Sequence, residues 1–129
     1  MGETVPEEAE RLLTSDPVMA HLATCREGRP HVAPVWYHYA DDEVEVLTTG
    51  RKLANVRANP RVALSIQRDE GGHAEWMVSL LGTARVVEDE DELRAAAARI
   101  NPRYGADPDA WSDNTLVRVD VGSATYRTY

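Results

Sequence analysis

Apolar and polar residues alternate along much of the chain, and a period of two is typical of β-strands. Two such stretches, 18–26 and 31–39, flank the link Glu-Gly-Arg-Pro and predict a β-hairpin, because its glycine and proline favour a turn. Further strands are predicted over 44–49, 61–67, 76–87 and 115–129. The links between most of them are short, which favours antiparallel pairing in a small closed β-barrel.

Helical spacing is confined to short segments between these strands. It predicts helices over 4–14, 51–58 and 88–100, with Thr4 as the candidate cap of the first. Asn-Pro pairs should end the second and third helices, since the residue before a proline avoids the helical conformation. The chain 1–129 is therefore expected to form one domain, mainly β, with short peripheral helices and a loop over 101–114.

Two residues inside the predicted strands are unusual for a regular sheet. Pro34 cannot donate a ladder hydrogen bond, so its strand should lie at a sheet edge or face a ligand. Gly82 predicts a bulge or a close approach of another backbone.

Composition narrows the class of protein. With 43% hydrophobic and 28% charged residues, the chain resembles an ordinary soluble globular domain. It has neither a long apolar run nor the basic start of a secretory signal, so a cytoplasmic location without a membrane partner is expected. A single cysteine, Cys25, excludes an internal disulfide. The formal net charge of -8 argues against binding of nucleic acid, which requires a broad basic surface.

The segment 48–68 departs from this acidic background. It contains no acidic residue but holds the only lysine, Lys52, together with Arg51, Arg57, Arg61 and Arg68. Thr48, Thr49 and Gly50 precede a helix that begins with Arg51 and Lys52, and free amides at a helix N-terminus favour an anion. The pattern predicts a phosphate site; the alternative is a solvated basic face.

The strand 31–39 is the second candidate site. Alternation places Val32, Pro34, Trp36 and His38 on one face. An extended backbone beside an aromatic ring could stack against a flat heterocycle. The alternative is that Trp36 and the neighbouring tyrosines belong to the core or to an interface.

Other kinds of chemistry find little support. The four histidines lack metal-ligand spacing, so no metal site is predicted. Neither a Gly-x-Ser-x-Gly elbow nor a Walker loop is present, and no catalytic side chain is assigned.

Several short motifs follow one another in a fixed order over residues 8–100. They are Ala23-Thr24, Gly28, Pro30 to Val32, Pro34 to Trp36, Lys52, Asn55, Pro60 to Val62, and Gly82, Ala84 and Val86. In this order they resemble the flavin-binding split-barrel superfamily that includes pyridoxamine 5'-phosphate oxidase. The resemblance implies a homodimer of six-stranded antiparallel split barrels that binds FMN in clefts between the subunits.

The resemblance also implies roles for individual residues. Pro34, Val35 and Trp36 would lie along the isoalloxazine ring. Asn55 would brace the loop, and Trp76 and Met77 of the other subunit would close the cleft. The phosphate would be held by Thr48, Thr49, Arg51 and Lys52. The implied reaction is hydride transfer at the flavin N5, for which the protein supplies orientation and electrostatics.

Two departures from the oxidase pattern concern the substrate. His31 and Trp36 stand where the oxidase has an arginine and a substrate-binding lysine, and the C-terminal substrate motif is missing. These departures speak against pyridoxamine phosphate as the substrate. A different small-molecule substrate is expected. The Pro-Val-Trp motif is closer to a branch that uses FMN or a deazaflavin coenzyme, whose anionic tail Arg57 and Arg61 could contact. A cofactor carrier without turnover and a heme-binding relative remain alternatives.

Overall fold

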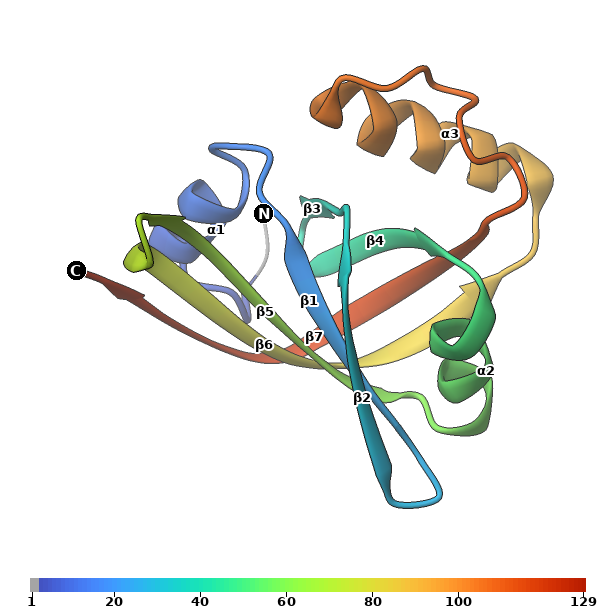
Figure 1. The fold of residues 1–129 in the computed structure, drawn as a ribbon, viewed down its shortest axis with the longest axis horizontal. Helices are drawn as coiled ribbons and strands as arrows, with labels where there is room; N and C mark the ends of the chain where they lie inside the picture. Colours follow the sequence, from blue (N-terminus) through green and yellow to red (C-terminus); the bar gives the residue numbers. More distant parts are fainter. Residues whose placement is uncertain (1–2) are drawn as a thin grey trace.

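The main body of the protein is one antiparallel sheet with helices around it (Figure 1). The computed structural model describes residues 3–129. The strands are β1 (Ala20–Arg26), β2 (Arg29–Val35), β3 (His38–Ala40), β4 (Glu43–Thr48), β5 (Arg61–Glu70), β6 (His73–Val87) and β7 (Thr115–Thr128). The helices are α1 (Glu7–Leu13), α2 (Gly50–Ala58), α3 (Glu90–Ile100) and the 3-10 helix η1 (Asn101–Tyr104).

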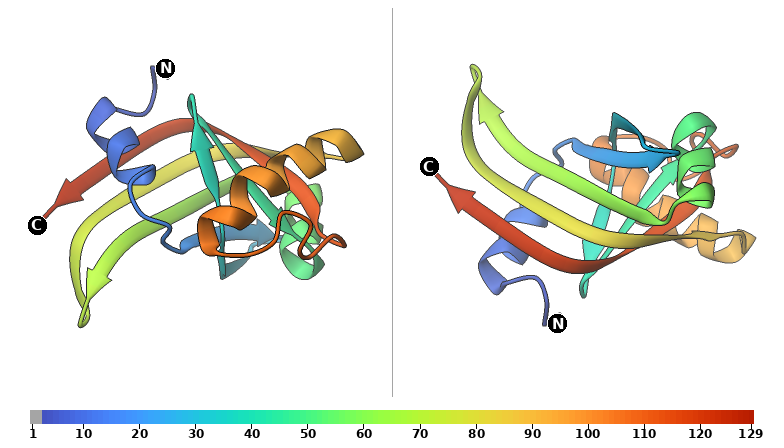
Figure 2. Two further views of the ribbon diagram at one scale, coloured as in Figure 1. Left: turned by 90° about the horizontal axis from the view of Figure 1, so that it is seen from above. Right: turned by 90° about the horizontal axis from the view of Figure 1, so that it is seen from below.

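The sheet has seven strands in the order β2-β1-β5-β6-β7-β4-β3, so β2 and β3 are its edges. The edge position predicted from Pro34 is confirmed. The expected count of six strands is wrong, because the predicted strand 31–39 breaks at Trp36 and Tyr37 into β2 and β3. These two residues join opposite edges of one curved sheet (Figure 2). The expected closed barrel is also wrong, because β2 and β3 do not pair within residues 3–129 and the sheet stays open between them.

Helix α3 has a side-chain cap at its N-terminus, whereas α1 has none. Asp89 caps α3, because its carboxylate accepts hydrogen bonds from the amides of Asp91 and Glu92. Thr4 does not cap α1, which begins after Pro6 without a side-chain cap. The amides of residues 3–5 instead donate to the Asp42 carboxylate. Burial opposes the charge on Asp42, but these hydrogen bonds outweigh it and lower the pKa of Asp42.

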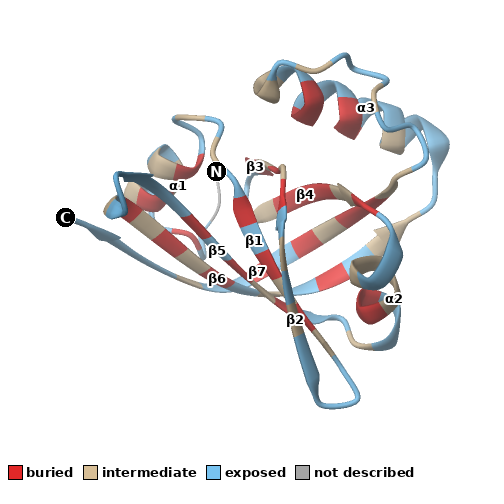
Figure 3. Ribbon diagram, in the orientation of Figure 1, coloured by how far each residue is buried: buried red, intermediate tan, exposed pale blue. Residues whose placement is uncertain are grey.

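The hydrophobic core lies on one face of the sheet and beneath α1 (Figure 3). Leu22, Leu64 and Leu80 come from neighbouring strands and are almost fully buried. At β4 both faces are covered, since α3 contacts this strand, and Val44, Glu45 and Val46 are all buried. The alternation of apolar and polar residues along β4 did not indicate that Glu45 is buried.

Gly82 stands at a register shift between β6 and β7, which confirms the predicted bulge. A Cβ atom at this position would lie 2.5 Å from the Asp120 carbonyl oxygen. Gly82→Ala should therefore lower the free energy of unfolding by about 1–3 kcal/mol, the usual cost of overpacking. Urea denaturation would measure it. Gly122→Ala is the matched control, because the nearest atom to its Cβ would be 3.6 Å away, and an equal loss in both variants would contradict the explanation.

No helix in the described part of the chain is long and apolar enough to cross a membrane.

Candidate functional site

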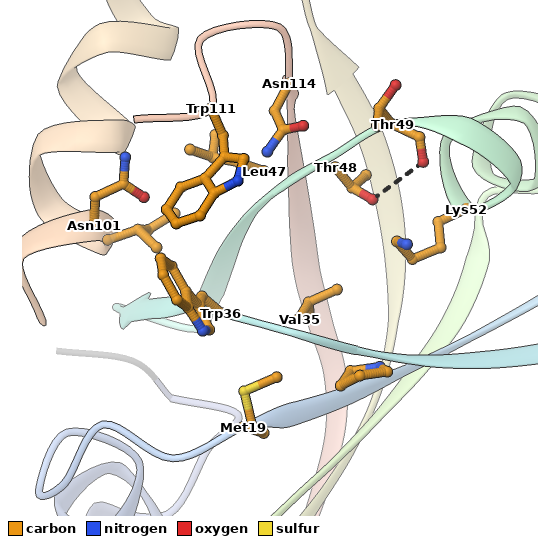
Figure 4. Close-up of a pocket in the computed structure, with 12 residues that line it drawn as sticks. Met19, Val35, Trp36, Leu47, Thr48, Thr49, Lys52, Asn101, Trp111 and Asn114 are labelled. Carbon is orange, nitrogen blue, oxygen red and sulfur yellow. Dashed lines mark hydrogen bonds between the residues drawn. The ribbon is translucent and has the colours of Figure 1, made fainter. Parts of the chain in front are cut away.

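A cleft of about 240 Å³ opens where the ends of β2 and β4 approach α2 and the segment after α3. Its aromatic end carries Trp36 and Trp111, and its polar end carries Thr48, Thr49 and Lys52 (Figure 4). The lining residues are Met19, Pro34, Val35, Trp36, Leu47, Thr48, Thr49, Lys52, Ile100, Asn101, Trp111 and Asn114. One end therefore suits a flat apolar group and the other an anion.

The polar end is built from the turn between β4 and α2. Thr48 is buried, and its hydroxyl donates to the Thr49 carbonyl oxygen at 3.5 Å. Thr49 is extended and does not cap α2 with its side chain, and the first turn of α2 contains no acidic residue. The free amides and the dipole at this helix start both favour a negative charge.

The aromatic end is held by η1. The Trp36 ring stacks on Tyr104 with centroids 4.7 Å apart and an interplanar angle of 3°. Trp111 meets Trp36 edge-on at 5.0 Å. Arg103 donates to the Tyr37 carbonyl oxygen at 2.9 Å, and Tyr104 accepts from the Tyr37 amide at 3.3 Å. The link between the two sheet edges is thereby attached to the segment after α3.

The Tyr37 side chain is part of the same attachment. Its hydroxyl donates to the Leu13 carbonyl oxygen at 2.6 Å, and the residue has no exposed surface. Burial raises the pKa of Tyr37 to about 12, although the nearby Arg103 acts in the opposite direction. Tyr37 is therefore a buried, neutral residue whose hydroxyl is used to hold the chain after α1.

The structure brings together only some of the residues predicted from sequence. Pro34, Val35, Trp36, Thr48, Thr49 and Lys52 line the cleft. Arg51 and Asn55 line a neighbouring hollow. Asn55 is buried, and its amide nitrogen donates to the Thr24 hydroxyl at 3.0 Å, which attaches α2 to β1.

Trp76 and Met77 do not line the cleft of their own chain. Trp76 is 6% exposed and belongs to the hydrophobic core, where it pairs in the sheet with Arg68 and Thr128. Met77 lies next to it on β6 and is partly buried. The suggestion that they close a partner's cleft stays a prediction.

Several lining residues were not singled out from sequence. Trp111 and Asn114 come from the loop 101–114, which was expected to help shape the substrate pocket, but neither residue was named individually. Asn101 is buried and donates to the carbonyl oxygens of Pro108 and Ala110, so it shapes that loop. An isolated tryptophan in a polar loop was the available signal for Trp111.

Residues 3–129 contain no cluster of three histidine, cysteine or acidic side chains that could hold a metal ion.

A family model described as pyridoxamine 5'-phosphate oxidase matches residues 5–127, nearly the whole chain. This chain belongs to the pyridoxamine 5'-phosphate oxidase family. The search of curated proteins found no match. The family assignment agrees with the order of motifs that runs from Ala23 to Val86.

Solved structures share the fold of this family member. An FAD-binding protein of Mesorhizobium loti has a TM-score of 0.78 at 21% identity, covering 98% of this chain and 97% of its own. An F420 reductase has a TM-score of 0.76 at 26% identity, covering 94% and 98%. The heme storage protein HutZ of Vibrio cholerae has a TM-score of 0.77 at 22% identity, covering 95% and 93%. Similar folds therefore occur in proteins named for different cofactors.

Proposed function

We propose that the protein is an oxidoreductase that binds FMN, or alternatively a deazaflavin coenzyme, and transfers hydride to or from a small unsaturated organic substrate. The observation that carries this proposal is the cleft itself, with aromatic rings at one end and Lys52 with two threonines at the other. A flavin supplies hydride transfer at its N5 when it is bound. Family membership and the flavin- and deazaflavin-related neighbours support this choice of cofactor.

The residues of the cleft have distinct tasks in this proposal. Lys52 and the amides at the start of α2 would bind the ribityl phosphate, while Thr48 and Thr49 offer hydroxyl groups beside it. β2 is an edge strand, so the backbone amide and carbonyl groups on its outer side have no strand partner among the described residues. These groups could form hydrogen bonds with the flavin ring. Trp36 and Trp111 would exclude water from the reacting face.

Heme fits the cleft less well. The cleft lining in the described chain includes no histidine, cysteine or tyrosine, so Met19 is the one common axial ligand of heme iron among its residues. His38 lies outside the cleft, and its Nδ1 atom is 3.3 Å from the Glu45 carboxylate. A flavin needs no axial ligand and is the better match for an aromatic cleft with a cationic end.

We further propose that the protein works as a homodimer. Paired positions across β2, β1, β5 and β6 place Val32, Ala23, Ala63 and Leu81 in one row. This row lies on the opposite face from the buried leucines of the core, and Val32 and Leu81 are 65% and 57% exposed. A contiguous apolar row of this kind is typical of an interface. β2 carries both the row and the cleft, so a partner bound there would extend the cleft wall.

The size of the cleft agrees with a shared site. Its 240 Å³ is smaller than the roughly 300–1,000 Å³ usual for pockets that enclose a small molecule. A cofactor in one chain would remain partly uncovered, and the partner subunit would cover the rest.

One sedimentation experiment tests cofactor and assembly together. The protein is saturated with FMN and sedimented while the visible absorption of the cofactor is followed. The proposal expects flavin absorption to sediment at the mass of a dimer and to separate from the protein on dilution. A fully occupied monomer would contradict the shared cleft, and absence of FMN and deazaflavin binding would contradict the proposed function.

Turnover separates an enzyme from a carrier. The bound flavin is photoreduced without oxygen and then mixed with quinones, enones or oxygen. Rapid reoxidation by one organic class would identify the substrate class. Failure of all organic acceptors would favour a carrier.

A further inference from the structure

A separate space, which we call the α3 hollow, lies between α3 and the loop that leads to β7. Its volume is about 330 Å³. Its apolar lining comes from Leu93 and Ala97 of α3, from Pro108 and Ala110 of the loop, and from Leu47 and Trp111. Leu47 and Trp111 also line the cleft (Figure 4). The two spaces are therefore neighbours, and these two side chains form the partition between them.

Trp111 is the exposed part of this partition. Its ring meets Trp36 edge-on at 5.0 Å, and the residue is 58% exposed. Leu47, in contrast, is fixed in the sheet, where it pairs with Leu116 of β7. The Trp111 ring can therefore be removed without unpacking the hydrophobic core, and its loss would join the cleft to the α3 hollow.

The backbone of Trp111 is strained. Its φ angle is 52°, in the left-handed region that bulky residues rarely adopt. The Asn101 side chain donates to the carbonyl oxygens of Pro108 and Ala110, and the Asn114 amide donates to the Trp111 carbonyl oxygen. Strained residues persist where the surrounding structure imposes them, and they cluster at functional sites. The loop thus holds the ring between the two spaces against its own backbone preference.

The lining of the α3 hollow suits an uncharged apolar group. Leu93 is half-buried there and faces the space together with the apolar loop residues. The charged residues of the lining are Glu90, Asp109 and Arg94, and Arg94 pairs with Asp91. The acidic side chains therefore oppose a carboxylate or a phosphate in this space.

We propose that Trp111 is a specificity-determining residue that closes the cleft against the α3 hollow and so limits the substrate to compact molecules. Once the ring is removed, the α3 hollow becomes the site of an uncharged apolar arm that extends from the reacting group. The proposal rests on the proposed function and deepens it, because it states which organic acceptors the wild-type protein accepts.

The test compares cyclohexenone with a butyl derivative of it as acceptors for the photoreduced flavoprotein. Wild-type protein should prefer cyclohexenone. Trp111→Gly should shift the ratio of the two kcat/KM values toward the butyl derivative by at least about tenfold, because the arm buries several methylene groups. Glycine adopts a positive φ without strain, so the loop should keep its conformation, which circular dichroism and urea denaturation check.

Two further variants test the roles of the ring and of the α3 hollow. Trp111→Phe keeps an aromatic partition and should keep the wild-type ratio. Leu93→Gln combined with Trp111→Gly should cancel the shift, because an amide replaces part of the apolar lining. Ala98→Gln combined with Trp111→Gly is the matched control, since Ala98 lies exposed on the same helix outside the hollow, and it should preserve the shift.

Two outcomes of these measurements would overturn the proposal. One is an unchanged ratio in Trp111→Gly, which would show that the ring does not limit the substrate. The other is a shift that survives Leu93→Gln, which would place the arm outside the α3 hollow. An arm that ends in a carboxylate should gain less than the butyl arm, and an equal gain would contradict the preference for an uncharged group.

Failure of the proposed function is distinguishable from failure of this proposal. If neither flavin nor deazaflavin binds the wild-type protein, butylcyclohexanone is titrated into the cofactor-free protein by calorimetry. Binding to Trp111→Gly that is at least about tenfold tighter than to wild type, and is lost with Leu93→Gln, would support the role of Trp111 without the cofactor. Equal affinity of wild type and Trp111→Gly would overturn that role as well.

Discussion

Glu45→Gln is expected to lower the free energy of unfolding by about 3 kcal/mol, the lower end of the cost of breaking a buried ion pair. Glu45 is 4% exposed and accepts two hydrogen bonds from Arg99, at 2.8 and 2.7 Å, and one from Arg118 at 3.0 Å. A neutral amide would remove one of the three carboxylates beside the mostly buried Arg118 guanidinium, which would keep only Glu43 and Glu92. We take the lower end because the Arg99 side chain is 39% exposed and keeps some hydration.

Urea denaturation at neutral pH measures this loss. Glu88→Gln is the control, because Glu88 forms an exposed ion pair with Arg57, and such pairs contribute at most about 1 kcal/mol. A similar small change in both variants would show that the charge on Glu45 is not needed to hold α3 against β4.

The same residue gives the stability a pH dependence. Burial alone would raise the pKa of Glu45, but hydrogen bonds from His38, Arg99 and Arg118 outweigh it and hold the pKa well below the ordinary value of 4.5. The carboxylate's contribution is therefore complete above pH 4.5 and is lost as the pH falls through the lower folded value. Wild-type protein should therefore lose stability more steeply than Glu45→Gln as the pH falls below 4.5. Parallel curves of the free energy of unfolding against pH would contradict the lowered pKa of Glu45.

Replacing Arg51 and Lys52 together with alanine is expected to weaken FMN binding by about 3 kcal/mol, roughly a hundredfold, while the fold stays intact. Lys52 lines the cleft beside Thr48 and Thr49, and Arg51 adds positive charge at the same helix start. Neither side chain has a partner among residues 3–129, so their loss breaks no internal contact. Fluorescence titration measures the affinity, and circular dichroism checks the fold.

Riboflavin provides a second ligand for this experiment. It lacks the phosphate, so the wild-type protein should prefer FMN and the double variant should lose that preference. Arg57→Ala is the control, because Arg57 belongs to the same helix but pairs with Glu88. Unchanged FMN affinity in the double variant would refute the phosphate assignment.

Local signals in the sequence predicted most of the sheet. The turn between β1 and β2 was expected from Gly28, and both Glu27 and Gly28 have positive φ, as tight hairpin turns require. Pro34 indicated an edge strand and Gly82 a bulge, and both are confirmed. These features depend on single residues with restricted or permissive backbones, which act regardless of distant neighbours.

The break between β2 and β3 could not be predicted from alternation. Side chains continue to alternate through Trp36 and Tyr37, so the pattern suggests one strand. The break is caused by Arg103 and Tyr104, which are far away in sequence and take the backbone groups of Tyr37. Contacts of this kind depend on the tertiary structure.

Charge placement was predicted only in part. Thr48, Thr49 and Lys52 gather at the cleft as the spacing suggested, but Arg51, one residue earlier, lines the neighbouring hollow with Asn55. The burial of Glu45 was missed because a strand with one polar face looks the same whether water or a helix covers that face. α3 covers it here and supplies Arg99.

The attachment of Tyr37 to η1 has a consequence for ligand affinity. The backbone of Tyr37, next to Trp36, is fixed by hydrogen bonds to Arg103 and Tyr104, and the Trp36 ring is stacked on Tyr104. This wall is preorganised, so a ligand that enters loses little of its binding energy to ordering the protein. The conformational entropy still to be lost on binding would come mainly from the ligand's own flexible chain.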